Sequence, residues 1–121
     1  MIVIVTGGRH YEDRQAVFRK LTRLKIEHGN ILVVQGECLT GADLYAREWA
    51  DENGYVCVGF HPPWKRLKLA AGPARNRVMA NIVAALQQPA LCVWFPGDRG
   101  TAGMKEQADR VGIELIEGEL V

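Results

Sequence analysis

The sequence predicts a single α/β domain, a three-layer sandwich with a five-stranded parallel sheet in the strand order 3-2-1-4-5. Five short apolar runs rich in β-branched residues recur along the chain of 121 residues, and segments of helical length with a 3.6-residue apolar period separate them. Right-handed crossovers between such strands place helices on both faces of the sheet. No repeat, low-complexity segment or linker interrupts residues 1–121, so we expect one domain.

The strand-forming runs are almost continuously apolar, which is typical of parallel strands that are buried on both faces. They cover residues 2–5, 31–34, 55–60, 90–95 and 113–116. Runs of this length fit strands better than core helices, which need about ten residues or more.

Capping residues mark the ends of the first two predicted helices. Asp13 is expected to cap the first helix at its start, and Gly29 follows its last turn. A capping box from Thr40 to Asp43 is expected to open the second helix, which Gly54 closes.

Prolines and a threonine mark the last two predicted helices. Pro73 is expected near the first position of the third helix, and Pro89 lies beyond its end. Thr101 is expected to cap the fourth helix, which Gly112 follows. Residues 61–72 show no regular pattern, and a stretch of this length after a strand indicates a functional loop.

The composition argues against several functional classes. Fifteen Lys and Arg residues against fourteen Asp and Glu leave a formal net charge of +1, which supplies no overall field for nucleic acid or for an acidic membrane. The first residues lack the basic segment and the length of a signal peptide, and no apolar run is long enough to span a bilayer. We therefore expect a cytoplasmic protein with no membrane and no nucleic acid among its partners.

The cysteines and histidines do not form a metal-binding pattern. Cys38, Cys57 and Cys92 are far apart, with no Cys-x-x-Cys and no Cys/His spacing. We expect Cys57 and Cys92 in the core and Cys38 in a loop, where it is a candidate nucleophile without a base nearby in the sequence. We expect neither a metal nor a bound cofactor.

Glycines and polar residues gather after four of the five strands. In a doubly wound sheet, ligands bind outside the carboxyl ends of the strands, near the point where the strand order reverses. The four segments are Thr6-Gly7-Gly8-Arg9, Gln35-Gly36-Glu37, His61-Pro62-Pro63-Trp64 and Pro96-Gly97-Asp98-Arg99-Gly100-Thr101. Their alignment at one edge of the sheet predicts a ligand site there.

The last of these segments leads into a helix and predicts a phosphate site. Glycines let the backbone approach a ligand closely, and the free amides of a first helical turn favour an anion. The field of a helix end contributes only about 0.3–1 kcal/mol at an exposed site, so cationic side chains are needed as well. Arg9, Arg75 and Arg99 are the candidates, with Arg75 expected in the first turn of the third helix.

Four motifs in order, VTGGRHYED, HPPWK, AGPARNRVM and FPGDRGTAGM, resemble the YspA-like, CpYpsA-related branch of the SLOG superfamily. Relatives of that branch include Smf/DprA proteins and the LONELY GUY phosphoribohydrolases. The resemblance implies a Rossmann-like fold that binds nucleotides or their derivatives. It also implies that the ligand-binding residues include Gly7, Gly8, Arg9, Gly72, Arg75, Asn76, Pro96, Gly97, Gly100 and Thr101, with Met79 part of the same helix motif.

The chain departs from the motifs of these relatives at points that matter for catalysis. The phosphoribohydrolases carry a catalytic Glu three residues after the Gly-Thr pair, where this chain has Met104. Asp98 stands where the branch has the second Gly of its phosphate loop. The loop after the second strand, residues 36–43, lacks one Gly and is one residue longer than the pattern of the branch.

Two functions therefore remain in competition. The first is binding of a nucleotide or nucleotide-derived ligand, as a sensor or sequestering module. The alternative is an N-glycosidase or phosphoribohydrolase in which Glu37, Asp43 or Asp98 replaces the missing carboxylate. A third role, linked to DNA, rests only on analogy with Smf/DprA proteins.

Some predicted roles at the site have a structural alternative. Trp64 is expected either to stack on the base or sugar of the ligand or to pack its loop onto the domain. Glu37 or Asp43 is expected to accept hydrogen bonds from sugar hydroxyls, although Asp43 has the alternative role of a helix cap. Asp98 is expected to turn outward or to pair with Arg99 so that it does not repel phosphate. A homo-oligomer is also compatible with the sequence.

Overall fold

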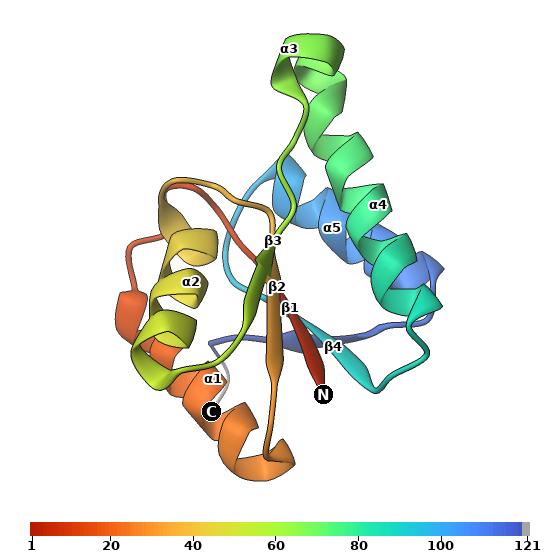
Figure 1. Ribbon diagram of the computed structural model, residues 1–121. Helices are drawn as coiled ribbons and strands as arrows, with labels where there is room; N and C mark the ends of the chain where they lie inside the picture. Colours follow the sequence, from red (N-terminus) through yellow and green to blue (C-terminus); the bar gives the residue numbers. More distant parts are fainter. Residues whose placement is uncertain (120–121) are drawn as a thin grey trace.

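The computed structural model describes residues 1–119 and contains one sheet of five parallel strands in the order β3-β2-β1-β4-β5 (Figure 1). The strands are β1 (Ile2–Thr6), β2 (Leu32–Gln35), β3 (Cys57–Gly59), β4 (Ala90–Trp94) and β5 (Glu114–Glu117). All four pairings between neighbours are parallel. The predicted Rossmann-like fold and its strand order are confirmed.

Helices cover both faces of the sheet and create two separate cores. The helices α1 (Arg14–His28) and α2 (Gly41–Asn53) pack on one face, where Trp49 is completely buried against strand residues such as Val33. The helices α4 (Ala71–Ala85) and α5 (Arg99–Arg110) pack on the other face (Figure 1). Their buried side chains include Met79 and Met104. Each strand of the centre is thus buried on both faces, as its continuous apolar sequence predicts.

Three predicted caps are confirmed. The side chain of Asp13 accepts a hydrogen bond from the amide of Ala16 at 3.0 Å. Gly29 and Gly54 end α1 and α2 with positive φ angles, and Gly54 adopts the left-handed conformation that favours glycine at a helix C-terminus.

The predicted capping box of α2 is wrong. The Thr40 hydroxyl donates to the carbonyl of Arg9 at 2.7 Å and makes no cap hydrogen bond. Asp43 instead accepts from the amide of Cys38, at 3.2 Å. Both side chains therefore hold neighbouring loops, because the start of α2 lies against the loop that follows β1.

The predicted cap of α5 is also wrong. Asp98 is the N-cap residue, and its Oδ1 atom accepts from the amide of Gly100 at 3.4 Å. Thr101 lies inside the first turn, where its side chain is buried under the loop that contains Gly97. Asp98 is exposed, as expected, but no ion pair joins it to Arg99 within residues 1–119.

The segment predicted to be irregular contains two short helices, α3 (Trp64–Leu67) and the 3-10 helix η1 (Lys68–Ala70). Pro62 and Pro63 begin α3, since their carbonyls accept from the amides of Trp64 and Leu67 at 2.9 Å. Because η1 leads directly into α4, that helix begins at Ala71 and Arg75 lies in its second turn. The prediction that Arg75 lies in the first turn is therefore wrong.

None of the helices described here is long and apolar enough to cross a membrane.

Candidate functional site

The loops after β1 and β4 meet at the carboxyl ends of the central strands. The amide of Gly8 donates to the carbonyl of Pro96 at 2.9 Å. A Cβ atom on Gly8 would lie 3.1 Å from both that carbonyl oxygen and the Cα atom of Gly97. Gly41 adds a third backbone segment to this junction. Its φ is +73°, and a Cβ atom on Gly41 would collide with the carbonyl oxygen of Gly8. Three backbone segments are in contact here, so a side chain at Gly41 would collide with the backbone and one at Gly8 would fit tightly.

The hydroxyl of Thr101 lies beside this junction and has no hydrogen-bond partner within residues 1–119. Thr101 is 6% exposed, and its Oγ1 atom is buried without a partner among the described residues. It lies so close to Gly97 that a Cβ atom there would collide with it. A buried polar atom without a partner costs about 1–3 kcal/mol, so its presence calls for an explanation.

Arg75 connects the end of β2 to α4. Its Nη1 atom donates to the carbonyl of Gly36, and its Nε atom donates to Oδ1 of Asn76 at 2.7 Å. Asn76, which is almost fully buried, in turn donates to the carbonyl of Gly100 at 3.3 Å. One chain of hydrogen bonds therefore runs from the end of β2 through α4 to the first turn of α5.

Asp43 faces this chain from the start of α2. Burial raises the pKa of Asp43, while the Cys38 amide and the positive charge of Arg75 oppose the rise. Burial likewise lowers the pKa of Arg75, and the carboxylate of Asp43 opposes that change. Each charge is thus poorly hydrated and is stabilised by the other. An anion that reaches the remaining side of Arg75 would meet a cation with little water to displace.

Glu37 forms a second polar cluster at the ends of β2 and β3. Its backbone has a φ of 59°, a left-handed conformation that is uncommon for a residue with a side chain. Its amide donates to Oε1 of Gln35, and its Oε2 atom lies 3.2 Å from Nδ1 of His61. The carboxylate also covers Gly59, where a Cβ atom would collide with it. Glu37 is therefore held in place by the ends of two neighbouring strands.

The sequence placed Gln35 in one of the predicted site segments but gave it no role, and it did not predict the partnership of Glu37 with His61. Gln35 is almost fully buried although it ends an apolar strand. A side-chain amide at the end of such a strand is the signal in the sequence that could have identified Gln35 as a site residue. The partnership with His61 spans 24 residues and depends on the pairing of β2 with β3. No spacing in the sequence indicates it.

Other predicted site residues lie at the margin of these two clusters. Trp64 begins α3, is 49% exposed, and lies 3.7 Å from where a Cβ atom on Gly72 would be. Arg9 is exposed, and its backbone carbonyl holds Thr40. The structure thus brings the glycine loops, Thr101 and Arg75 together and leaves these side chains at the edge.

Met104, at the position where the phosphoribohydrolases have their catalytic Glu, is a core residue. It is 1% exposed and packs with the apolar residues of α4 and the sheet. A thioether can neither stabilise a developing positive charge nor activate water. Any catalytic carboxylate must therefore come from another position.

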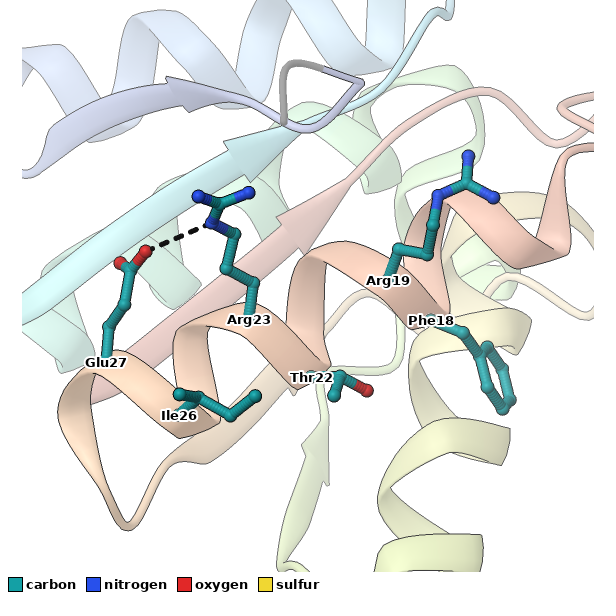
Figure 2. A pocket seen from close by; sticks show the side chains of 6 residues that line it. All are labelled: Phe18, Arg19, Thr22, Arg23, Ile26 and Glu27. Carbon is teal, nitrogen blue, oxygen red and sulfur yellow. Dashed lines mark hydrogen bonds and ion pairs between the residues drawn. The ribbon is translucent and has the colours of Figure 1, made fainter.

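A shallow hollow of about 690 Å³ lies on the outer surface of α1, away from these clusters (Figure 2). It is lined by Phe18, Arg19, Thr22, Arg23, Ile26 and Glu27. None of these residues belongs to a loop at the carboxyl ends of the strands, and Arg23 and Glu27 are paired with each other at 3.2 Å. Within residues 1–119, no group of three or more His, Cys, Asp or Glu residues could hold a metal ion.

Comparison with protein families gives one match. A model described as the YspA, cpYpsA-related SLOG family matches residues 1–67. The matched part contains the loops after β1, β2 and β3, whereas the motifs at the starts of α4 and α5 lie outside it. A search of curated proteins found no match to the chain.

Proposed function

The chain belongs to the YspA, cpYpsA-related SLOG family, and from that membership and the geometry of the strand ends we propose that it binds a nucleotide or a nucleotide-derived ligand. The ligand's phosphate lies against the loop from Gly97 to Thr101, and its nucleoside extends towards the ends of β2 and β3. The protein acts as a sensor of the ligand or sequesters it.

The unpartnered hydroxyl of Thr101 is the observation that carries this proposal. A phosphate oxygen beside Gly97 would accept its hydrogen bond and would also face the amides of the first turn of α5. Gly100 has open space where a Cβ atom would lie, whereas the Thr101 hydroxyl fills the Cβ position of Gly97, so the phosphate reaches that hydroxyl when the loop around Gly97 shifts. The cost of burying the hydroxyl in the free protein is then offset when the ligand binds.

Asp98 occupies the same helix end in the free protein. Its hydrogen bond to the amide of Gly100 is long, at 3.4 Å, and therefore weak. A phosphate carries more charge and more acceptor atoms than this carboxylate. We expect the phosphate to displace Asp98 from the amide of Gly100, and the exposed position of Asp98 lets it move into solvent.

Arg75 supplies the positive charge. Two of its nitrogens hold Gly36 and Asn76, while Nη2 makes no hydrogen bond to another part of the described chain. A guanidinium fixed in this way loses little conformational freedom when it donates to a phosphate oxygen.

Hydrolysis of an N-glycosidic bond is a second candidate, which the Glu37–His61 pair favours. Of the three candidate carboxylates, Asp43 is buried and Asp98 caps α5, whereas Glu37 is exposed beside a histidine. Glu37 would take a proton from water as the water oxygen bonds to the anomeric carbon. The bond from that carbon to the base breaks, and its electron pair stays on the base nitrogen, which a proton neutralises.

Two measurements test these functions. Thermal denaturation with a panel of nucleoside monophosphates and dinucleotides should show a concentration-dependent rise in melting temperature for at least one of them. No rise with any nucleotide, together with no small molecule released from the purified protein in mass spectrometry, would refute binding. Chromatography of the same mixtures reports base release, and release that persists in a Glu37→Gln variant would exclude Glu37 as the base.

A further inference from the structure

One face of the edge strand β3 is not covered by a helix. Val58 pairs in register with Val34, which is buried in the core under α4 and α5, so Val58 points to that same face. Val56 directly precedes β3, and its carbonyl still accepts from the amide of Val33 in β2 at 3.1 Å, so the alternation of side chains places it on this same face. Both valines are nevertheless exposed, whereas Cys57 between them packs against the core under α1 and α2.

The flank of α4 that faces β3 is also apolar and exposed. Val78, Ile82 and Leu86 are spaced four residues apart and therefore lie on one flank of α4. The helix α5 contacts another side of α4, since Asn81, about 100° around the helix from Ile82, accepts from Arg110 of α5 at 2.5 Å. Arg75, on the same flank as Val78, reaches the end of β2 and so shows which way this flank points. Figure 1 shows β3 at the sheet edge and α4 beyond it.

These five side chains form an uncharged surface, which we call the β3–α4 surface: Val56, Val58, Val78, Ile82 and Leu86. Each is between 38% and 65% exposed. Residues 54–60 and 78–89 contain no charged side chain. Interface cores are depleted of charge in the same way, whereas an ordinary solvated helix flank carries charges.

The size of this surface fits a dimer. From their exposed fractions, the five side chains present on the order of 400 Å² of apolar area, close to the apolar share of the roughly 800 Å² that each partner buries in a standard interface. The surface carries no charges, so it offers no electrostatic pattern that would select a different protein. For the same reason, no like charges would face each other in a contact between two copies of the chain.

We propose that the β3–α4 surface is the interface of a homodimer, in which a two-fold axis lays the α4 flank of each copy over the uncovered face of β3 of the other. The dimer buries Val58 and Ile82 of both copies. The strand ends that carry the candidate ligand site are not part of this contact.

Sedimentation velocity of the full chain over a wide range of concentration tests the proposal. We expect a species of about twice 13.4 kDa. Ile82→Glu and Val58→Glu each place a charge in the contact and should raise the dissociation constant of the dimer at least tenfold, so that the 13.4 kDa monomer predominates. Ile26→Glu is the matched control, because Ile26 is a 77% exposed apolar residue on α1.

Three outcomes decide the matter. Loss of the dimer in both variants, with the control dimeric and with circular dichroism unchanged, supports the proposal. A wild-type chain that stays monomeric at every concentration overturns the proposal, and the β3–α4 surface would then be a contact for a different protein. A dimer that survives Ile82→Glu overturns it too, because the contact must then lie elsewhere. Ile82 is exposed, so its substitution tests the interface even if Val58→Glu fails to fold.

Discussion

The Nη1 atom of Arg75 donates a hydrogen bond to the backbone carbonyl of Gly36, which joins the second turn of α4 to the end of β2. A Cβ atom on Gly36 would occupy the position of the guanidinium. The absence of a side chain at one residue thus makes room for the charge of another, 39 residues away in the sequence. The cation that we assign to the ligand phosphate is therefore held in place before the ligand binds.

Replacing Thr101 by Val should stabilise the free protein and weaken binding. Val has nearly the same shape, so the change removes the unpartnered hydroxyl and leaves the packing intact. We expect the free energy of unfolding to rise by about 1–3 kcal/mol and nucleotide affinity to fall. Urea denaturation and calorimetric titration measure the two effects. A variant that is less stable than wild type would show that the hydroxyl has a partner in the folded protein.

Replacing Asp98 by Asn should strengthen nucleotide binding. Asn can also cap α5, but it removes the negative charge that the phosphate must displace. We expect a roughly threefold to tenfold gain in affinity for a nucleoside monophosphate, which corresponds to about 0.7–1.4 kcal/mol. Asp109→Asn on the same helix is the control and should change little. A weaker complex with Asp98→Asn would mean that the carboxylate contacts the ligand favourably.

Trp64 allows an optical test of where the base lies. The ring is partly exposed at the start of α3, whereas Trp49 is buried against Tyr55 and Trp94 lies under Lys105. If the base stacks on Trp64, nucleotide binding quenches the fluorescence of wild type but hardly affects that of Trp64→Phe. Equal quenching in both proteins would show that Trp64 only packs its helix against Gly72.

Stability at alkaline pH should depend on Cys92. Burial raises the pKa of its thiol from 9.0 to about 12, so above pH 9.0 the unfolded chain releases this proton and the folded chain keeps it. The stabilisation is complete below that pH and is lost as pH rises, by about 1.4 kcal/mol per pH unit. Urea denaturation from pH 8 to about pH 10.5 should show a steeper loss in wild type than in Cys92→Ala. Parallel curves would contradict the shift.

Those parts of the fold that depend on local sequence were predictable. The continuous apolar runs predicted the strands. Three helix ends were predicted from Asp13, Gly29 and Gly54, because each of these residues acts within one turn of its own position. The cap of α5 was not predictable in the same way. Asp98 and Thr101 both have good capping side chains, and the choice between them depends on how the loop around Gly97, which contacts Gly8 of the loop after β1, folds over Thr101.

The location of the candidate site was predictable, but its internal contacts were not. The topology alone brings Gly8, Gly36 and Gly97 to one edge of the sheet. That Arg75 holds Gly36, or that Glu37 meets His61, depends on side-chain directions across neighbouring elements. The short helix α3 was missed because four residues show no periodicity.

The central claim is that the phosphate of a nucleotide ligand lies between Arg75 and the start of α5. The most direct test is calorimetric titration of wild type and Arg75→Ala with a nucleoside monophosphate and with its nucleoside, using Arg77→Ala as the control because Arg77 is exposed on the same helix. We predict that Arg75→Ala loses about 1.5–3 kcal/mol, or roughly 10- to 150-fold in affinity, for the nucleotide alone. Equal losses for both ligands would contradict the claim and would mean that Arg75 only supports the fold.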